Sequence, residues 1–165
     1  MIRIGHAWDT HKLQEGRRLI LGGVEINSKI GLLGHSDADV VLHAVAESLL
    51  GSLALGDLGT FFPDYSPKTL DMDSKVILRT CYNMVLEKGF ELVNLDLTIY
   101  SEYIKIAPIR FQIQQSIANI LNVSLDKISI KATTYEKMGF IGRGEAIACE
   151  CVCLVKNKIV KPILL

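Results

Sequence analysis

Hydrophobic and polar residues recur with two different periods along this chain, which predicts helices interleaved with strands. Over 37–53, apolar residues from Val40 to Leu49 follow a helical spacing, and Ser36 or Asp37 can cap the first turn. The same reasoning predicts helices over 73–88, which begins at Asp73 or Ser74 and is followed by Gly89, and over 108–121, where Pro108 suits the first turn.

Alternation with a period of two predicts the strands. They are expected over 2–5, 18–21 and 24–26 (a hairpin about Gly22-Gly23), 90–100, 126–134 and 146–156, with 159–165 extending or pairing with the last. Glycines and prolines predict a loop over 56–68. The early hairpin and the neighbouring terminal strands argue against a purely parallel sheet. We therefore expect an α+β fold, a mixed sheet with helices packed on one face, in a single domain spanning 1–165.

Composition limits the classes of partner that the protein is expected to bind. The 165 residues carry 18 Lys+Arg and 18 Asp+Glu, so no global positive field favours nucleic acid or an acidic membrane surface. No apolar run reaches the length of a membrane span, and the first residues lack the layout of a signal peptide. We expect a cytoplasmic protein that makes no nucleic-acid or membrane contact and binds any anionic substrate through a local site.

Three of the four cysteines, Cys149, Cys151 and Cys153, share one face of a strand. We interpret them as small apolar core groups; the alternative, a thiolate metal site, lacks paired Cys-x-x-Cys motifs. The segment 147–155 is apolar nearly throughout, so both of its faces are expected to meet protein, which indicates an oligomer.

Asp9 and His11 lie two residues apart, so on an extended backbone both side chains point the same way. We place them where the first strand meets a loop, with His43 in the first helix. Asp, His and His are ligand types of catalytic zinc. The spacing alone is weak, and His43 can instead be a hydrogen-bonded core histidine, with Asp39 or Glu47 orienting its ring in either case.

Several segments suit phosphate chemistry. Gly34-His35-Ser36 leads into a helix whose amides can meet an anion. The segment 131–137 leaves a strand end with two hydroxyls and an acid, and 139–145 places three glycines around Arg143. Each pattern alone is also typical of an ordinary turn.

Taken together, six stretches closely resemble one family: 3–11, 21–24, 31–40, 55–59, 62–64, and 131–134 through 148–150. It is the 2-C-methyl-D-erythritol 2,4-cyclodiphosphate synthase family of non-mevalonate isoprenoid biosynthesis. The resemblance implies a CMP-forming phosphorus–oxygen lyase. Its substrate, 4-diphosphocytidyl-2-C-methyl-D-erythritol 2-phosphate, closes into 2-C-methyl-D-erythritol 2,4-cyclodiphosphate.

The resemblance also implies site residues. Asp9, His11 and His43 would bind Zn²⁺ or another divalent transition metal, Glu136 would hold a second ion (Mg²⁺ or Mn²⁺), and His35 and Thr134 would stabilise the transition state. The substrate and its cytidine diphosphate moiety would contact Asp9, His11, His35, Ser36, Asp57, Leu58, Gly59, Phe62, Pro63, Asp64, Tyr65, Ser66, Ser101, Lys105, Ile106, Ala107, Thr133, Thr134, Tyr135 and Glu136.

The family resemblance further implies a homotrimer with its sheets facing the three-fold axis and with active sites between subunits. Phe140 and Arg143 would line a central cavity that can meet an isoprenoid diphosphate. Trp8, Glu47, Ser66 and Tyr103 depart from residues common in the family. Two other functions use the same residues: a zinc phosphoester hydrolase, and a binding protein for an isoprenoid diphosphate.

Overall fold

The computed structural model describes residues 1–67 and 69–158. Five strands form one mixed sheet in the order β4-β1-β7-β5-β6, in which only β5 and β6 run parallel. They are β1 (Ile2–Glu15), β4 (Ile30–Leu32), β5 (Phe90–Tyr100), β6 (Ile128–Thr133) and β7 (Ala146–Asn157). A separate hairpin pairs β2 (Leu19–Leu21) with β3 (Val24–Ile26). The expected α+β class and mixed sheet are confirmed, whereas β4 was not predicted.

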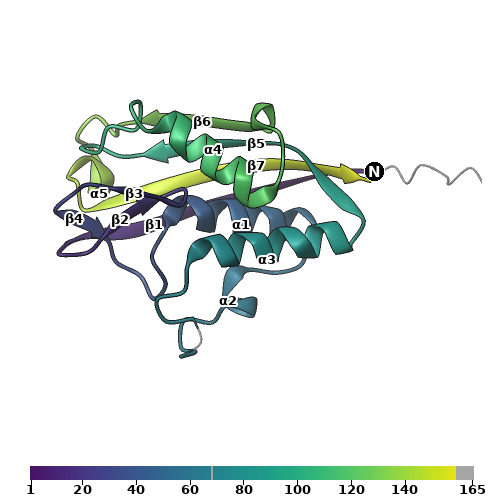
Figure 1. The fold of residues 1–165 in the computed structure, drawn as a ribbon. Helices are drawn as coiled ribbons and strands as arrows, with labels where there is room; N and C mark the ends of the chain where they lie inside the picture. The colour runs from purple at the N-terminus through teal and green to yellow at the C-terminus, as the bar shows by residue number, and fades with distance from the viewer. Residues whose placement is uncertain (68, 159–165) are drawn as a thin grey trace, which may run out of the picture.

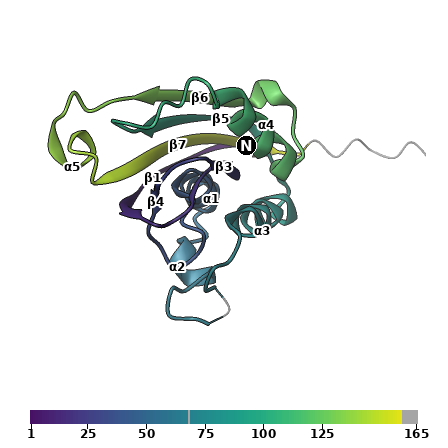
Figure 2. The ribbon, with the colours of Figure 1, turned by 60° about the vertical axis from the view of Figure 1, so that its left-hand side comes forward.

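The helices are α1 (Val40–Ser52), α2 (Leu58–Phe61), α3 (Ser74–Glu87), α4 (Arg110–Leu121) and α5 (Gly139–Gly142), with a 3-10 turn, η1, at Leu125–Lys127. Figure 2 shows α1 and α3 lying beneath the sheet. The core lies between these layers, where Cys149, Cys151 and Cys153 are fully buried and free, as the alternation predicted. The expected strand 159–165 lies outside the described residues.

The first strand is much longer than predicted. Instead of ending at Gly5, β1 pairs with β7 from Ile2 opposite Lys156 to Lys12 opposite Ala146, and then with β4 (Figure 1). Asp9 and His11 therefore lie within a strand rather than where a strand meets a loop. The polar residues after Gly5 do not resemble a strand locally; backbone pairing to β7 makes them one.

Helix α1 begins later than predicted, because its cap is Asp39 rather than Ser36 or Asp37. Ala38 adopts a left-handed φ of 59°, which keeps the preceding turn out of the helix. The fully buried Asp39 carboxylate accepts backbone N–H groups from Val41 and Leu42 in the helix and from Gly22 and Gly23 in the hairpin. Burial raises the pKa of Asp39 to about 6, against the opposing effect of these donors. This one side chain fixes the β2–β3 hairpin to the start of α1.

Similarly, α4 begins at Arg110 after Ile109, so Pro108 precedes the helix instead of occupying its first turn. The predicted loop over 56–68 contains the short α2, capped by Asp57, and the glycine-rich turn contains α5. The prediction for α3 is confirmed: Asp73 caps the helix by accepting the backbone N–H of Lys75, and Gly89 follows the helix with a φ of 78°.

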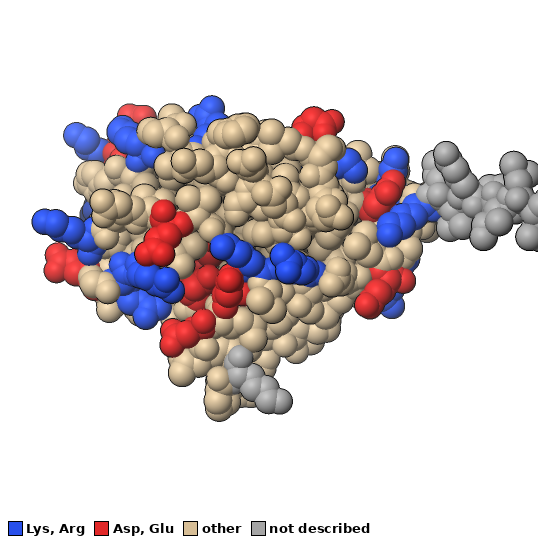
Figure 3. Space-filling view, viewed as in Figure 1, with Lys and Arg blue, Asp and Glu red and all other residues tan. Residues whose placement is uncertain are grey.

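The side of the sheet opposite α1 is not covered by the described helices. Ile4 of β1 is 66% exposed there, and Val152 of β7 is 37% exposed. On the face seen in Figure 3, positive and negative side chains are interspersed, without a broad patch of one sign. None of the described helices is long and apolar enough to cross a membrane.

Candidate metal centre and substrate hollow

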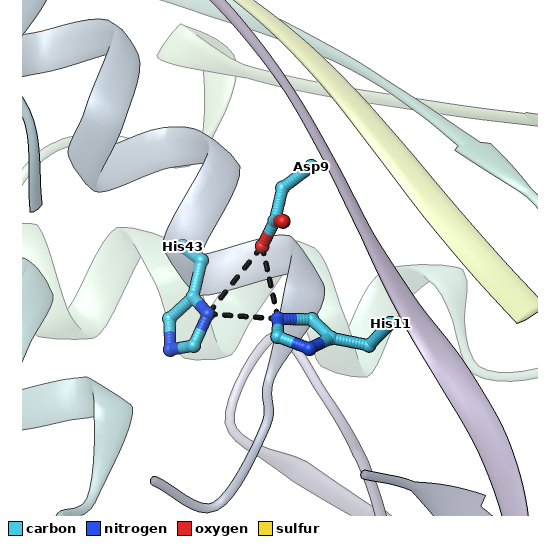
Figure 4. A group of neighbouring side chains, drawn as sticks. All are labelled: Asp9, His11 and His43. Carbon is cyan, nitrogen blue, oxygen red and sulfur yellow. Dashed lines mark hydrogen bonds and ion pairs between the residues drawn. The ribbon is translucent and has the colours of Figure 1, made fainter. Parts of the chain in front are cut away.

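Two elements bring Asp9, His11 and His43 together: β1 carries the first two on the face toward α1, and α1 carries the third (Figure 4). Close contact between strand and helix makes this possible. A Cβ on Gly5 would lie 1.8 Å from the backbone oxygen of Ser48, so only glycine lets α1 approach β1 this closely. Asp9 Oδ2 lies 3.0 Å from His11 Nε2 and 3.4 Å from His43 Nδ1, and the two nitrogens are 3.1 Å apart.

These distances fit a metal ion. Zinc bonds of about 2.0–2.1 Å at tetrahedral angles place neighbouring ligand atoms about 3.3 Å apart. The Nδ1–H of His11 donates to the carbonyl oxygen of Leu33 over 3.2 Å, because a carbonyl can only accept. Its Nε2 therefore presents a lone pair to the same point as the Asp9 carboxylate. A cluster of this kind is stabilised by a cation, either a proton or a metal.

The pKa shifts of Asp9 and His11 agree with a cluster that is stabilised by a cation. Burial opposes the charged form of Asp9, yet hydrogen bonds and charge from His11 and His43 hold the pKa of Asp9 well below its usual range. Burial lowers the pKa of His11, but Asp9 outweighs it, so the net shift is upward. Among the described residues, this is the one group of three or more acidic, His or Cys side chains with converging ligand atoms.

The expected partners of His43 are corrected by the structure. Its Nε2 lies 2.9 Å from the hydroxyl of Ser74 and 3.2 Å from that of Ser36, not against Asp39 or Glu47. The carboxylate of Asp39 is already used to cap α1. Glu47 accepts the backbone N–H of Leu58 over 2.9 Å and thereby joins α1 to α2. Burial raises the pKa of Glu47, with the Leu58 N–H acting against it. The sequence did not predict the contact with Ser74, because Ser74 lies 31 residues from His43 along the chain.

A hollow of about 460 Å³ opens beside the cluster. Gly34, Thr69, Ile77 and the expected metal ligand His43 line it. Most residues expected to contact substrate from this half of the chain line it too: His11, His35, Ser36, Leu58, Gly59, Phe62, Pro63, Asp64 and Tyr65. His35 Nε2 donates to the backbone oxygen of Ser66 over 3.2 Å. Asp57 does not line this hollow; its carboxylate accepts from Thr60 and caps α2. Trp8 and Glu47 line an adjoining pocket with the three clustered residues.

A second recess, of about 260 Å³, lies at the ends of β5 and β6. Its walls include Ser101, Lys105, Ile106, Ala107, Thr133 and Thr134, which are expected to hold cytidine, but not Tyr135 or Glu136. Thr134 Oγ1 donates to Glu136 Oε1 over 3.0 Å, and Tyr135 packs edge-on against Tyr100. Tyr103 lies against Gly144, and Arg143 pairs with Glu145 over 2.7 Å beside the half-exposed Phe140.

The two hollows do not meet within one chain. In the sheet register, Asp9 pairs with Cys149, Cys149 with Ile99 and Ile99 with Ala132. Three interstrand steps of about 4.8 Å therefore separate β1 from β6, roughly 14 Å in all. The structure thus groups His35 with the metal ligands but leaves Thr134 in the other recess, with Glu136 hydrogen-bonded to it.

Comparison with known proteins identifies the family of this chain. The model of the YgbB family matches residues 2–156. A 2-C-methyl-D-erythritol 2,4-cyclodiphosphate synthase of Leptospira interrogans is 50% identical over 160 residues, covering 96% of this chain and 99% of the relative.

Solved structures agree with that match. The Plasmodium falciparum IspF–CDP complex superposes with a TM-score of 0.85 at 36% identity, covering 96% of this chain and 97% of that one. The bifunctional IspDF of Campylobacter jejuni gives 0.92 at 37% identity; it covers 96% of this chain, which spans 43% of IspDF. This chain belongs to the YgbB family, the family of the 2-C-methyl-D-erythritol 2,4-cyclodiphosphate synthases.

Proposed function

We propose that this chain converts 4-diphosphocytidyl-2-C-methyl-D-erythritol 2-phosphate into 2-C-methyl-D-erythritol 2,4-cyclodiphosphate and CMP, a lyase reaction of non-mevalonate isoprenoid biosynthesis. The observation that carries the proposal is the convergence of Asp9, His11 and His43 beside a hollow large enough for a sugar-alcohol diphosphate. The near full-length identity to synthases of that name supports it.

In this reaction an oxygen of the substrate's own 2-phosphate attacks the β-phosphorus. One phosphorus–oxygen bond forms, the bond to the α-phosphate oxygen breaks, and CMP leaves with the electron pair. Attacker and target belong to one molecule, so holding them in a folded-back pose supplies much of the rate, up to about 7–11 kcal/mol of barrier. No nucleophilic side chain is required.

We assign Asp9, His11 and His43 to Zn²⁺ or another divalent transition metal, and Glu136 to a second ion, Mg²⁺ or Mn²⁺, shared with the diphosphate. When bound, these ions supply positive charge that polarises phosphate oxygens. His35 and Thr134 would donate hydrogen bonds where negative charge develops. The apolar side chains of Phe62 and Pro63 would limit access of water to the phosphates.

We assign the second recess to cytidine. Lys105 would pair with phosphate oxygens, and the backbone of 101–107 and the hydroxyls of Thr133 and Thr134 would surround the base and ribose. Solved relatives with bound CDP support a ligand of this class.

We further propose that the enzyme is a homotrimer whose uncovered sheet faces meet around the three-fold axis. Two observations support this assembly. Ile4 and Val152 expose apolar surface on that face. The separation of roughly 14 Å between β1 and β6 also keeps Thr134 away from phosphates held at the metal cluster of the same chain, whereas a neighbouring copy can place its Thr134 there. Phe140 and Arg143 would then line the central cavity and meet an isoprenoid diphosphate.

We take residues 1–165 as one cytoplasmic synthase domain, in keeping with its single core and four free buried thiols.

The test is turnover of the authentic substrate in water enriched in oxygen-18, with products followed by phosphorus NMR and mass spectrometry. A cyclase releases CMP and a cyclic diphosphate without the heavy isotope. An open 2,4-bisphosphate containing oxygen-18 would identify a hydrolase, and binding without CMP release would identify an isoprenoid-binding protein.

The His43→Ala variant tests the role of the cluster in the same assay. We expect the fold to be retained but bound metal and turnover to be lost, because only two of the three protein ligands remain. Turnover near that of the unmodified enzyme would refute the metal assignment.

A further inference from the structure

The ring of His43 has two nitrogens with different surroundings, and the side away from the cluster holds an ordered chain of polar groups. Nε2 lies 2.9 Å from the hydroxyl oxygen of Ser74. Ser74 is fully buried and is the first residue of α3. The same hydroxyl donates to Oδ1 of Asp37, and the backbone N–H of Ser74 donates to Oδ2 over 3.1 Å.

The directions of these hydrogen bonds follow from chemistry. A carboxylate only accepts, so the single proton of the Ser74 hydroxyl points to Asp37. The hydroxyl oxygen then has only lone pairs to offer His43, and Nε2 must carry the proton that fills the 2.9 Å contact. With its proton on Nε2, His43 presents a lone pair at Nδ1, the atom that faces Asp9 and His11.

The backbone holds this chain of groups in place. Asp37 N–H donates to the carbonyl of Met72, and Asp71 N–H donates to that of His35. These bonds join the turn before α1 to the segment before α3. Ser74 therefore stands at a fixed position against a ring that belongs to another helix.

We propose that Ser74, held by Asp37, is a positioning residue that fixes the tautomer and orientation of His43 for metal binding. The proposal rests on the metal role assigned to His43 above. It distinguishes between two neighbouring hydroxyls. Ser36 also lies 3.2 Å from Nε2, but it accepts the backbone N–H of Ala38 and is not hydrogen-bonded to Asp37.

The decisive variant is Ser74→Ala, measured for Zn²⁺ and Co²⁺ affinity by competition with a chromophoric chelator. Groups that orient a metal-bound histidine typically contribute about 10–100-fold to affinity, so we expect the metal Kd to rise by that factor. The helix cap survives the change, because Asp73 and not Ser74 caps α3. Ser52→Ala is the matched control: it removes another buried serine hydroxyl, which donates to the carbonyl of Leu49 and also contacts the Cys153 thiol.

Nitrogen-15 NMR of the imidazoles gives a readout that a loss of stability alone would not produce. The chain has four histidines, so the Nε2–H of His43 can be assigned. In the zinc-loaded enzyme we expect a slowly exchanging Nε2 proton, which becomes fast-exchanging in Ser74→Ala but not in Ser52→Ala.

A double variant tests the link to Asp37. If Asp37 acts through Ser74, Ser74→Ala combined with Asp37→Asn binds metal within twofold of Ser74→Ala alone. Three results overturn the proposal: an unchanged Kd and Nε2 signal in Ser74→Ala, an equal or larger loss in Ser36→Ala, or additive losses in the double variant. Should the chain form no cyclic product while Ser74→Ala still weakens metal binding, the proposed function fails and this inference stands.

Discussion

Replacing Gly5 with alanine tests whether the contact between β1 and α1 builds the metal cluster. The added Cβ would lie 1.8 Å from the carbonyl oxygen of Ser48 and 2.9 Å from the Cβ of Ser52. Both atoms belong to α1, and the closer one is backbone that no rotamer change can move. Ordinary contacts begin near 3.5 Å, so strand and helix must separate by more than about 1 Å.

That displacement is large for a metal site. Ligand distances in such sites hold to within about 0.2 Å, and β1 carries Asp9 and His11 whereas α1 carries His43. We expect the metal Kd of Gly5→Ala to rise at least about tenfold. Overpacking should also lower the free energy of unfolding by about 1–3 kcal/mol.

The assay uses the chain's single tryptophan. Trp8 lines the same pocket as the three ligands, so quenching of its emission by Co²⁺ follows occupancy of the site directly. Urea denaturation of the same samples gives stability.

Gly51→Ala is the matched control, since it adds the same methyl group to α1. The nearest atom to that methyl is the backbone oxygen of His6, at 4.0 Å. We expect unchanged metal affinity and stability higher by up to about 1 kcal/mol, because alanine favours a helix over glycine. If Gly5→Ala binds Co²⁺ and unfolds like the unmodified enzyme, the close approach does not set the ligand geometry.

Two further predictions concern other parts of the chain. Glu150 accepts hydrogen bonds from Tyr100 and His6, and both bonds lower the pKa of Glu150. The bond between Tyr100 and Glu150 also raises the pKa of Tyr100 to about 12. A group whose pKa is lower in the folded state stabilises the fold at pH values above its unfolded-state pKa, about 4.3 for Glu. The melting temperature of the unmodified protein should therefore exceed that of Glu150→Gln at neutral pH, and the difference should shrink as pH falls below about 4.3. A difference in melting temperature that stays constant with pH would contradict this. Lys105→Ala should weaken CMP binding about tenfold or more in calorimetry while leaving metal content unchanged, and unaltered CMP affinity would remove Lys105 from the cytidine recess.

Local pattern was sufficient for much of the fold. The period of α3 and the alternation of β5 and β7 each follow from neighbouring residues, and all three elements lie where they were expected. The first strand is different, because polar residues from His6 to His11 are extended only through their pairing with β7. The start of α1 was missed for a similar reason: Asp39 caps the helix while also binding the distant hairpin at Gly22.

The sequence alone determined the donor types, the shared direction of Asp9 and His11, and the family. It did so because side-chain alternation and short motifs depend on residues close in the chain. Tertiary structure decided which atoms meet. The packing of α1 against Gly5 brings His43 to Asp9, and Leu33 and Ser74 approach the far nitrogens of the two rings from separate segments. Those contacts join residues 22 and 31 positions apart, and such a distance in sequence leaves no periodic signal to read.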